Sequence, residues 1–125
     1  MPKILIGLLG LLLIAACGGD EGGGPIAGDN VTVKMFDNRY EFDEITIPEG
    51  GMVTFAGAGR NPHNAIAVDG SWSTEDVFGS LEQLEGDEAQ LIFNTAGTYV
   101  FYCTFHGNAD GAGMAGTLTV ETPTQ

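Results

Sequence analysis

The sequence predicts an all-β fold, a sandwich or barrel of about seven short strands with one short helix or loop insertion. Runs rich in valine, isoleucine, threonine and aromatic residues alternate apolar with polar side chains, which is the period of a half-buried strand. Turn sequences such as PEGG, DG and TAG separate these runs at short intervals. No glycine-rich phosphate loop lies between a strand and a helix. Short strands at this spacing are typical of a sandwich or barrel.

The expected strands follow one another from residue 31 to residue 121. They cover residues 31–37, 43–51, 52–59, 63–70, 89–97, 98–106 and 115–121. Between the fourth and fifth strands, the sequence SWSTEDVFGSLEQLEG (71–86) breaks the alternation. Ser73 and Asp76 have the spacing of a capping box, so a short helix is expected there. In the sixth strand, successive side chains point to opposite faces of the sheet. One face is therefore expected to carry Tyr99, Phe101, Cys103 and Phe105.

Residues 1–16 are predicted to be a signal peptide. Lys3 is followed by an apolar run, 4–16, whose helical length of roughly 20 Å is short of the ~30 Å core of a bilayer. The sequence IAAC that ends this stretch resembles the lipobox of bacterial lipoproteins. The resemblance implies that Cys17 becomes the mature N-terminus and carries lipid. The alternative is ordinary cleavage after the alanines, with Cys17 removed or without a role.

A glycine-rich acidic stretch, GGDEGGGPIAGD, follows Cys17 and has no apolar periodicity. Residues 17–29 are therefore expected to form a lipidated cysteine and a flexible tether with a reach of about 20 Å. The domain itself is expected to occupy residues 30–125. Two acyl chains on Cys17 would anchor it stably to a membrane.

The chain is strongly acidic, with a formal net charge of −13 from 4 basic and 17 acidic residues. All acidic residues follow Cys17, and removal of Lys3 leaves 3 − 17 = −14 for the mature chain. Nucleic acid and anionic lipid are poor partners for such a surface, and no nucleic acid is expected as a partner. A basic protein partner and a saline habitat would each account for the charge.

Cys103 has no cysteine to pair with if Cys17 is lipidated, so no intramolecular disulfide is expected. An odd thiol outside the cytoplasm is exposed to oxidation unless it is buried or bonded. A metal ion bonded to the sulfur of Cys103 would meet this requirement.

The domain carries four soft or borderline metal donors. They are the thiol and thioether of Cys103 and Met114 and the imidazoles of His63 and His106. Two imidazoles and a thiolate with a weak axial thioether are typical of blue-copper electron-transfer sites. Zinc would prefer a further thiolate, imidazole or carboxylate to a thioether. Ligand softness therefore favours copper.

Two segments, NPHNAIAVD and YCTFH…GMAGTLTV, resemble the copper-binding segments of the plastocyanin/halocyanin branch of the cupredoxins. The resemblance extends over about residues 31–120. It implies a cupredoxin-like Greek-key β-sandwich and a blue (type 1) site for one copper ion per chain. The ligands that it implies are His63, Cys103, His106 and Met114.

The resemblance also implies roles for three neighbours of these ligands. Asn64 is expected to tie the His63 segment to the cysteine loop, and Thr104 is expected to be the hydrogen-bonding neighbour of the cysteine. Tyr102 faces away from Cys103 and corresponds to a position that contributes to an electron-exchange surface. The alternative for Tyr102 is an ordinary tyrosine of an amphipathic strand.

One spacing departs from the family. Plastocyanins have four residues between the second histidine and the methionine, whereas residues 107–113 lie between His106 and Met114 here. The extra residues are expected to bulge outward while Met114 still caps the site. The longer spacing affects the expected distance from the Met114 sulfur to the metal, and this axial distance influences the reduction potential.

The predicted function is one-electron transfer by copper, without enzymatic turnover. The alternative is a copper-binding module that stores or delivers the metal. A metal-free immunoglobulin-like interaction domain would fold without copper. Cys–His nucleophilic catalysis would need an exposed, activated thiol, and a multicopper oxidase would need more histidines than this chain has.

The expected partners are redox proteins that donate and accept the electron, such as a cytochrome or a terminal oxidase with a basic docking patch. The expected location is outside the cytoplasm, at the periplasmic or extracellular face of a membrane through the lipid on Cys17.

Overall fold

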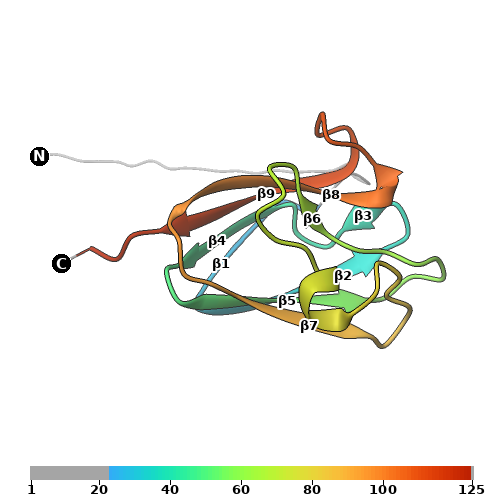
Figure 1. The fold of residues 1–125 in the computed structure, drawn as a ribbon, viewed down its shortest axis with the longest axis horizontal. Coiled ribbons are helices and arrows are strands. Elements are labelled where there is room, and N and C mark those ends of the chain that lie inside the picture. The colour runs from blue at the N-terminus through green and yellow to red at the C-terminus, as the bar shows by residue number, and fades with distance from the viewer. Residues whose placement is uncertain (1–22, 125) are drawn as a thin grey trace, which may run out of the picture.

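Two β-sheets pack face to face in the computed structural model of this protein, which describes residues 23–124 (Figure 1). The predicted signal peptide, Cys17 and the residues up to 22 lie outside the described part. The first sheet has the strand order β1-β4-β9-β8-β6, with bounds Pro25–Ala27, Glu44–Pro48, Gly113–Glu121, Gly97–Gly107 and Ile66–Ala67. The second has the order β3-β2-β5-β7, with bounds Arg39–Tyr40, Asn30–Phe36, Gly51–Gly57 and Glu88–Phe93.

Parallel and antiparallel pairs are mixed in both sheets. β2 pairs parallel with β5, and β4 pairs parallel with both β1 and β9. The other pairs are antiparallel, including the long pair of β8 with β9. The predicted all-β sandwich is confirmed, and the mixed topology is consistent with a Greek key.

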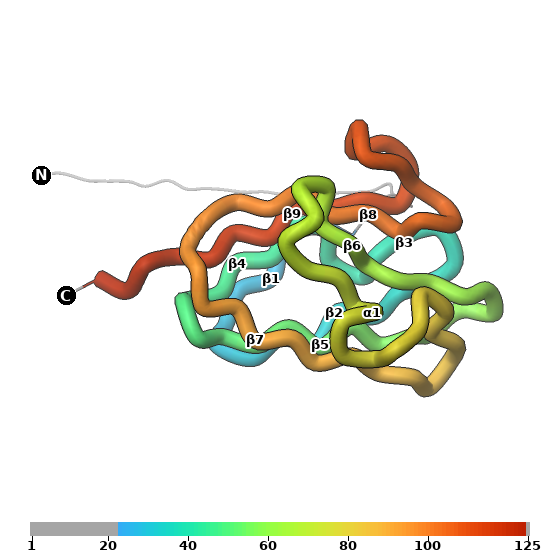
Figure 2. Tube along the Cα trace, in the orientation of Figure 1, coloured from blue at the N-terminus to red at the C-terminus, as the bar shows by residue number. Residues whose placement is uncertain are grey.

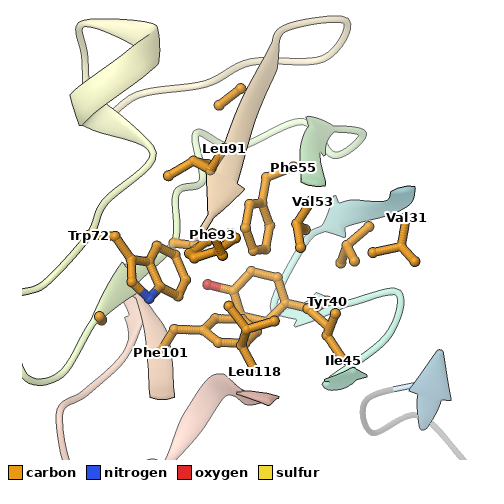
Figure 3. Close-up of a cluster of buried hydrophobic side chains, with 14 of the residues drawn as sticks. Val31, Tyr40, Ile45, Val53, Phe55, Trp72, Leu91, Phe93, Phe101 and Leu118 are labelled. Atoms are coloured by element: carbon orange, nitrogen blue, oxygen red, sulfur yellow. The ribbon is translucent and has the colours of Figure 1, made fainter. Parts of the chain in front are cut away.

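Alternating side chains of both sheets fill the space between them. The burial pattern of β2 is strictly alternate, as is that of β7, so the period-two pattern of the sequence correctly marks the inner face. At the centre, Tyr40 meets Phe101 edge-on with ring centroids 4.9 Å apart, and Phe55 lies 5.6 Å from Phe101 (Figure 3). Edge-to-face pairs at these distances stabilise a core beyond the area they bury.

The predicted short helix is α1, Glu75–Phe78. Only one half of the expected capping box is present: the Ser73 N–H donates to Asp76 Oδ2, whereas Ser73 Oγ accepts from the Glu75 N–H instead of the Asp76 N–H. The residue at the N-cap is Thr74. The helix ends at Gly79, which is left-handed. Within residues 23–124 no helix is long and apolar enough to cross a bilayer.

The structure differs from the expected strands in three places. Residues 25–27, expected within the tether, form β1 because their backbone pairs with β4. A two-residue turn after β2 leads into β3, a strand that the sequence did not indicate. The expected strand 63–70 is reduced to β6, since the backbone of His63 pairs instead with Gln83.

The exposure of Phe105 also differs from the expectation. Strict alternation places it inside with Cys103, but it is 45% exposed. The pairing of β8 with β9 shifts register between Tyr102 and Gly107, and the alternation of buried and exposed side chains ends after Thr104. The chain from β8 to β9 then projects from one end of the sandwich (Figure 2).

Candidate metal centre

Three predicted ligands converge on one point in the folded chain. Potential ligand atoms of His63, Cys103 and His106 all lie within 4.8 Å of one another. Cys103 Sγ is 3.8 Å from His63 Nδ1 and also 3.8 Å from His106 Nδ1. His63 and Cys103 are completely buried, whereas His106 is half-buried. One edge of the cluster therefore faces solvent through a single imidazole.

The spacing of these atoms suits a metal with trigonal coordination. With metal–sulfur and metal–nitrogen bonds of about 2.3 and 2.0–2.1 Å, a 120° angle would separate sulfur from nitrogen by about 3.8 Å. That is the separation of Cys103 Sγ from both imidazole nitrogens. Two contacts of equal length, at the separation that trigonal coordination requires, fit one metal ion shared by the sulfur and both nitrogens.

The register shift in β8 brings two of the ligands together. Between the pairs Tyr102↔Ala115 and Gly107↔Gly113, the segment Cys103–His106 of β8 lies opposite a single residue of β9, which is Met114. The chain must bulge there, and the bulge returns His106 toward the cysteine. Met114 is buried, with 1% exposure, and lies near the three other residues.

The longer segment between His106 and Met114 is closed at its base. Gly107 pairs with Gly113, and an added Cβ on either would lie within 2.5 Å of a backbone oxygen of the other side. Beyond this pair, Asn108 closes a small loop: its N–H donates to the Ala112 carbonyl, and its side chain accepts from the Asp110 N–H. The extra residues therefore lie in the projecting loop, and Met114 remains in the core.

His63 is positioned by its backbone and by a carboxylate. Its N–H and C=O both hydrogen-bond to Gln83, at 3.1 Å each. Its Nε2 lies 3.0 Å from Asp37 Oδ1, on the side of the ring opposite Cys103. Because Nε2 is engaged by the carboxylate, Nδ1 is the nitrogen that is turned to the sulfur.

The pKa values of two groups at the site are shifted from their ordinary values. The hydrogen bond with His63, with help from the backbone N–H groups of Asn61 and Arg60, lowers the pKa of Asp37 to about 2. Desolvation, together with the neighbouring His63, lowers the pKa of His106. Both shifts favour the states that a metal site needs, an ionised carboxylate and a neutral imidazole.

Asn64 joins the two ligand segments. Its Oδ1 accepts from the Thr104 N–H at 3.0 Å, and its Nδ2 donates to Thr104 Oγ1 at 2.8 Å and to the Leu81 carbonyl at 2.9 Å. Asn64 follows His63 and Thr104 follows Cys103, so these bonds hold the histidine and the cysteine segments together. Tyr102, on the other side of Cys103, is half-buried and pairs across the sheet with Ile66 and Ala115.

Sequence reasoning missed two residues that support the site, Asp37 and Tyr40. Asp37 lies in the turn between β2 and β3, where Asn38 is left-handed with φ 74°. Tyr40 is buried, and its hydroxyl donates to the Asn64 carbonyl at 2.7 Å. The Asp-Asn pair is a turn signal, but nothing in the sequence indicates that this turn lies against His63.

Comparison with known proteins agrees with this geometry. Residues 28–121 match the family described as copper binding proteins, plastocyanin/azurin family. The chain is 32% identical over 126 residues to a plastocyanin of Prochlorothrix hollandica, with 95% of this chain and 88% of that protein covered. It is 34% identical to an amicyanin of Paracoccus versutus, covering 65% of this chain and 61% of that protein. The crystal structure of a Paracoccus versutus amicyanin superposes with a TM-score of 0.57 at 27% identity, covering 74% of this chain and 82% of that one.

Proposed function

Because the chain belongs to the plastocyanin/azurin family of copper-binding proteins, we propose that it is a one-electron carrier with a mononuclear blue copper site. His63, Cys103 and His106 would hold the ion in a trigonal arrangement, and Met114 would be the weak axial ligand. The observation that carries this proposal is the equal 3.8 Å separation of one buried thiol from two imidazole nitrogens. Bound copper would supply a Cu(I)/Cu(II) couple.

The protein's own residues would keep the ligands in place while the electron moves. The backbone of His63 is held by Gln83, and Asn64 joins it to Thr104. Cys103 is excluded from water inside the sandwich. Because the ligands would hardly move, little reorganisation of the site would accompany the change between the two oxidation states.

His106 is the ligand from which an electron would leave or enter. It is half-buried while His63 and Cys103 are not exposed at all. The neighbouring Phe105 exposes 45% of its surface and provides an apolar contact beside the imidazole. Tyr102, adjacent to Cys103 on the other side, would add a second contact. No substrate is turned over in this function.

The N-terminal sequence supports a location at the outer face of a membrane. A signal peptide over residues 1–16, with lipid on Cys17, would deliver the domain to the periplasm or cell exterior on a tether. The net charge of −14 expected after cleavage favours redox partners that present a basic patch. A cytochrome or a terminal oxidase with such a patch would suit as donor or acceptor.

The visible spectrum of the purified protein with one equivalent of Cu(II) tests the copper proposal. We expect an intense blue or green absorption that ascorbate bleaches and reoxidation restores. Cys103→Ser should abolish the band, whereas Cys17→Ser, which removes the other thiol, should keep it. A colourless protein, or a band that depends on Cys17, would contradict the proposal.

Storage or delivery of copper is the competing function. It would require release of the ion, so repeated reduction and oxidation in the presence of a Cu(I) chelator separates the two. A carrier should retain its metal through the cycles. Loss of copper upon reduction would favour delivery.

A further inference from the structure

The carboxylate of Asp37 is unusually well supplied with hydrogen-bond donors for a residue in a tight surface turn. Oδ1 contacts His63 Nε2 at 3.0 Å and accepts from the Asn61 N–H at 3.1 Å, while Oδ2 accepts from the Arg60 N–H at 3.2 Å. The side chain of Asp37 is 36% exposed, whereas that of His63 is fully buried. Asp37 therefore connects a buried imidazole to the surface.

The loop before His63 is shaped around this carboxylate. A Cβ added at Gly59 would lie 2.1 Å from Asp37 Oδ1 and 2.8 Å from its backbone nitrogen, so only glycine permits this approach. Close packing at Gly59 and two backbone N–H bonds fix where the carboxylate lies. The contact with His63 is thus built into two separate segments of the chain.

The contact with the carboxylate determines which ring nitrogen of His63 carries the proton. An ionised carboxylate only accepts hydrogen bonds, so Nε2 must carry the proton. In the neutral imidazole, Nδ1 then keeps its lone pair, and Nδ1 is the atom 3.8 Å from Cys103 Sγ. The arrangement has the order carboxylate, histidine, metal position.

From this geometry we propose that Asp37 is a positioning residue that acts through His63, keeping its Nδ1 available to the metal and favouring Cu(II) over Cu(I). The inference deepens the proposed copper function and rests on it. A negative charge hydrogen-bonded to the ligand makes the imidazole more basic, and the more highly charged Cu(II) gains more from that than Cu(I) does. Asp37 should therefore lower the reduction potential.

Asp37→Asn is the informative variant, because an amide oxygen in the place of Oδ1 still accepts from His63 and Asn61, while the charge and the Oδ2 bond from the Arg60 N–H are lost. Partners of this kind typically change metal affinity 10–100-fold. We expect about a tenfold weaker preference for Cu(II) over Cu(I), which corresponds to a rise of about 59 mV in the reduction potential. Voltammetry of the copper-loaded protein at pH 7 measures it.

Two control variants separate charge from loop structure. Asp69→Asn removes an equal charge from a carboxylate that is hydrogen-bonded to Ser71 in a different turn, and it should leave the potential unchanged. Tyr40→Phe loosens the His63 segment at Asn64 without changing any charge, and it should shift the potential much less than Asp37→Asn. Equal shifts in Asp37→Asn and either control would overturn the proposal.

Measurements without redox chemistry distinguish failure of this inference from failure of the copper carrier. In the metal-free protein, ¹⁵N–¹H correlation spectra should show the His63 proton on Nε2, and Asp37→Asn should weaken Zn(II) binding about tenfold. A proton on Nδ1, or unchanged Zn(II) affinity, would refute the role of Asp37 even in a blue protein. The expected result in a colourless protein would support Asp37 and refute only the carrier.

Discussion

Asn64 and Thr104 are joined by two hydrogen bonds that run in opposite directions. The Thr104 N–H donates to Asn64 Oδ1 at 3.0 Å, and Asn64 Nδ2 donates to Thr104 Oγ1 at 2.8 Å. The two residues are 40 positions apart, and each directly follows a residue of the metal cluster. The pair links the cluster's two segments outside the cluster itself.

Asn64→Ala should therefore weaken both folding and metal retention. It removes three hydrogen bonds made by a buried side chain, which we expect to cost about 2 kcal/mol of unfolding free energy. Thr104→Val is the matched control, since it loses only the hydroxyl bond and keeps the backbone bond. Denaturant unfolding and the rate of copper loss to a chelator measure the two effects. Equal losses in both variants would show that the hydroxyl bond alone joins the segments.

Tyr40→Phe should destabilise the domain without altering the metal donors. The buried Asn64 carbonyl loses its hydroxyl partner, and an unmade buried hydrogen bond costs about 1–2 kcal/mol. Tyr99→Phe removes a similar bond to the Thr95 carbonyl at an exposed site, where water replaces it. Urea unfolding should show a clearly larger effect for Tyr40→Phe, and equal effects would contradict this account.

Gly113→Ala should damage the closure beneath the projecting loop. Gly113 is left-handed at φ 73°, and a Cβ there would lie 2.5 Å from the His106 carbonyl oxygen. Gly111 is left-handed too, at φ 86°, but has open space around it. Gly111→Ala should cost roughly 1–2 kcal/mol of backbone strain, and Gly113→Ala should cost more and shift the visible band. An unchanged spectrum in Gly113→Ala would show that the loop base does not position Met114.

Copper binding should raise the thermal stability through Cys103. A ligand present at 100 times its dissociation constant stabilises the folded state by about 2.7 kcal/mol. The midpoint of unfolding should therefore rise with added Cu(II), and chelation should reverse the rise. In Cys103→Ser the rise should be much smaller. A rise of equal size in this variant would show that copper stabilises the protein elsewhere.

Acid should remove the contribution of Asp69 to stability. Hydrogen bonds from the Ser71 hydroxyl and N–H lower the pKa of Asp69 below its ordinary value of 3.8. Its stabilisation is therefore complete above pH 3.8 and is lost as the pH falls through the lower, folded-state pKa. Asp69→Asn should be less stable than the unchanged protein near neutral pH, and the difference should fade below pH 3.8. A difference that grows on acidification would contradict this sign.

Much of the fold was predictable because a strand buried on one face leaves a period-two pattern in the sequence. β2 and β7 show this pattern without interruption, and both were expected. The pattern failed at Phe105, where β8 bulges, and at β1, whose three residues contain too little pattern to recognise. Bulges and short edge strands depend on the neighbouring strand, which local sequence does not reveal.

The sequence by itself determined the kind of protein and the donors it offers: an acidic β-sandwich with one unpaired cysteine in the domain, two histidines and a methionine in recognisable segments. Their chemistry is intrinsic to the side chains, so it could be read without coordinates. Only the tertiary structure decided which groups surround the donors. Asp37 and Tyr40 reach His63 and Asn64 from 26 and 24 residues away. Such contacts arise when two sheets close on each other, because packing sets distances between residues that the order of the chain leaves free.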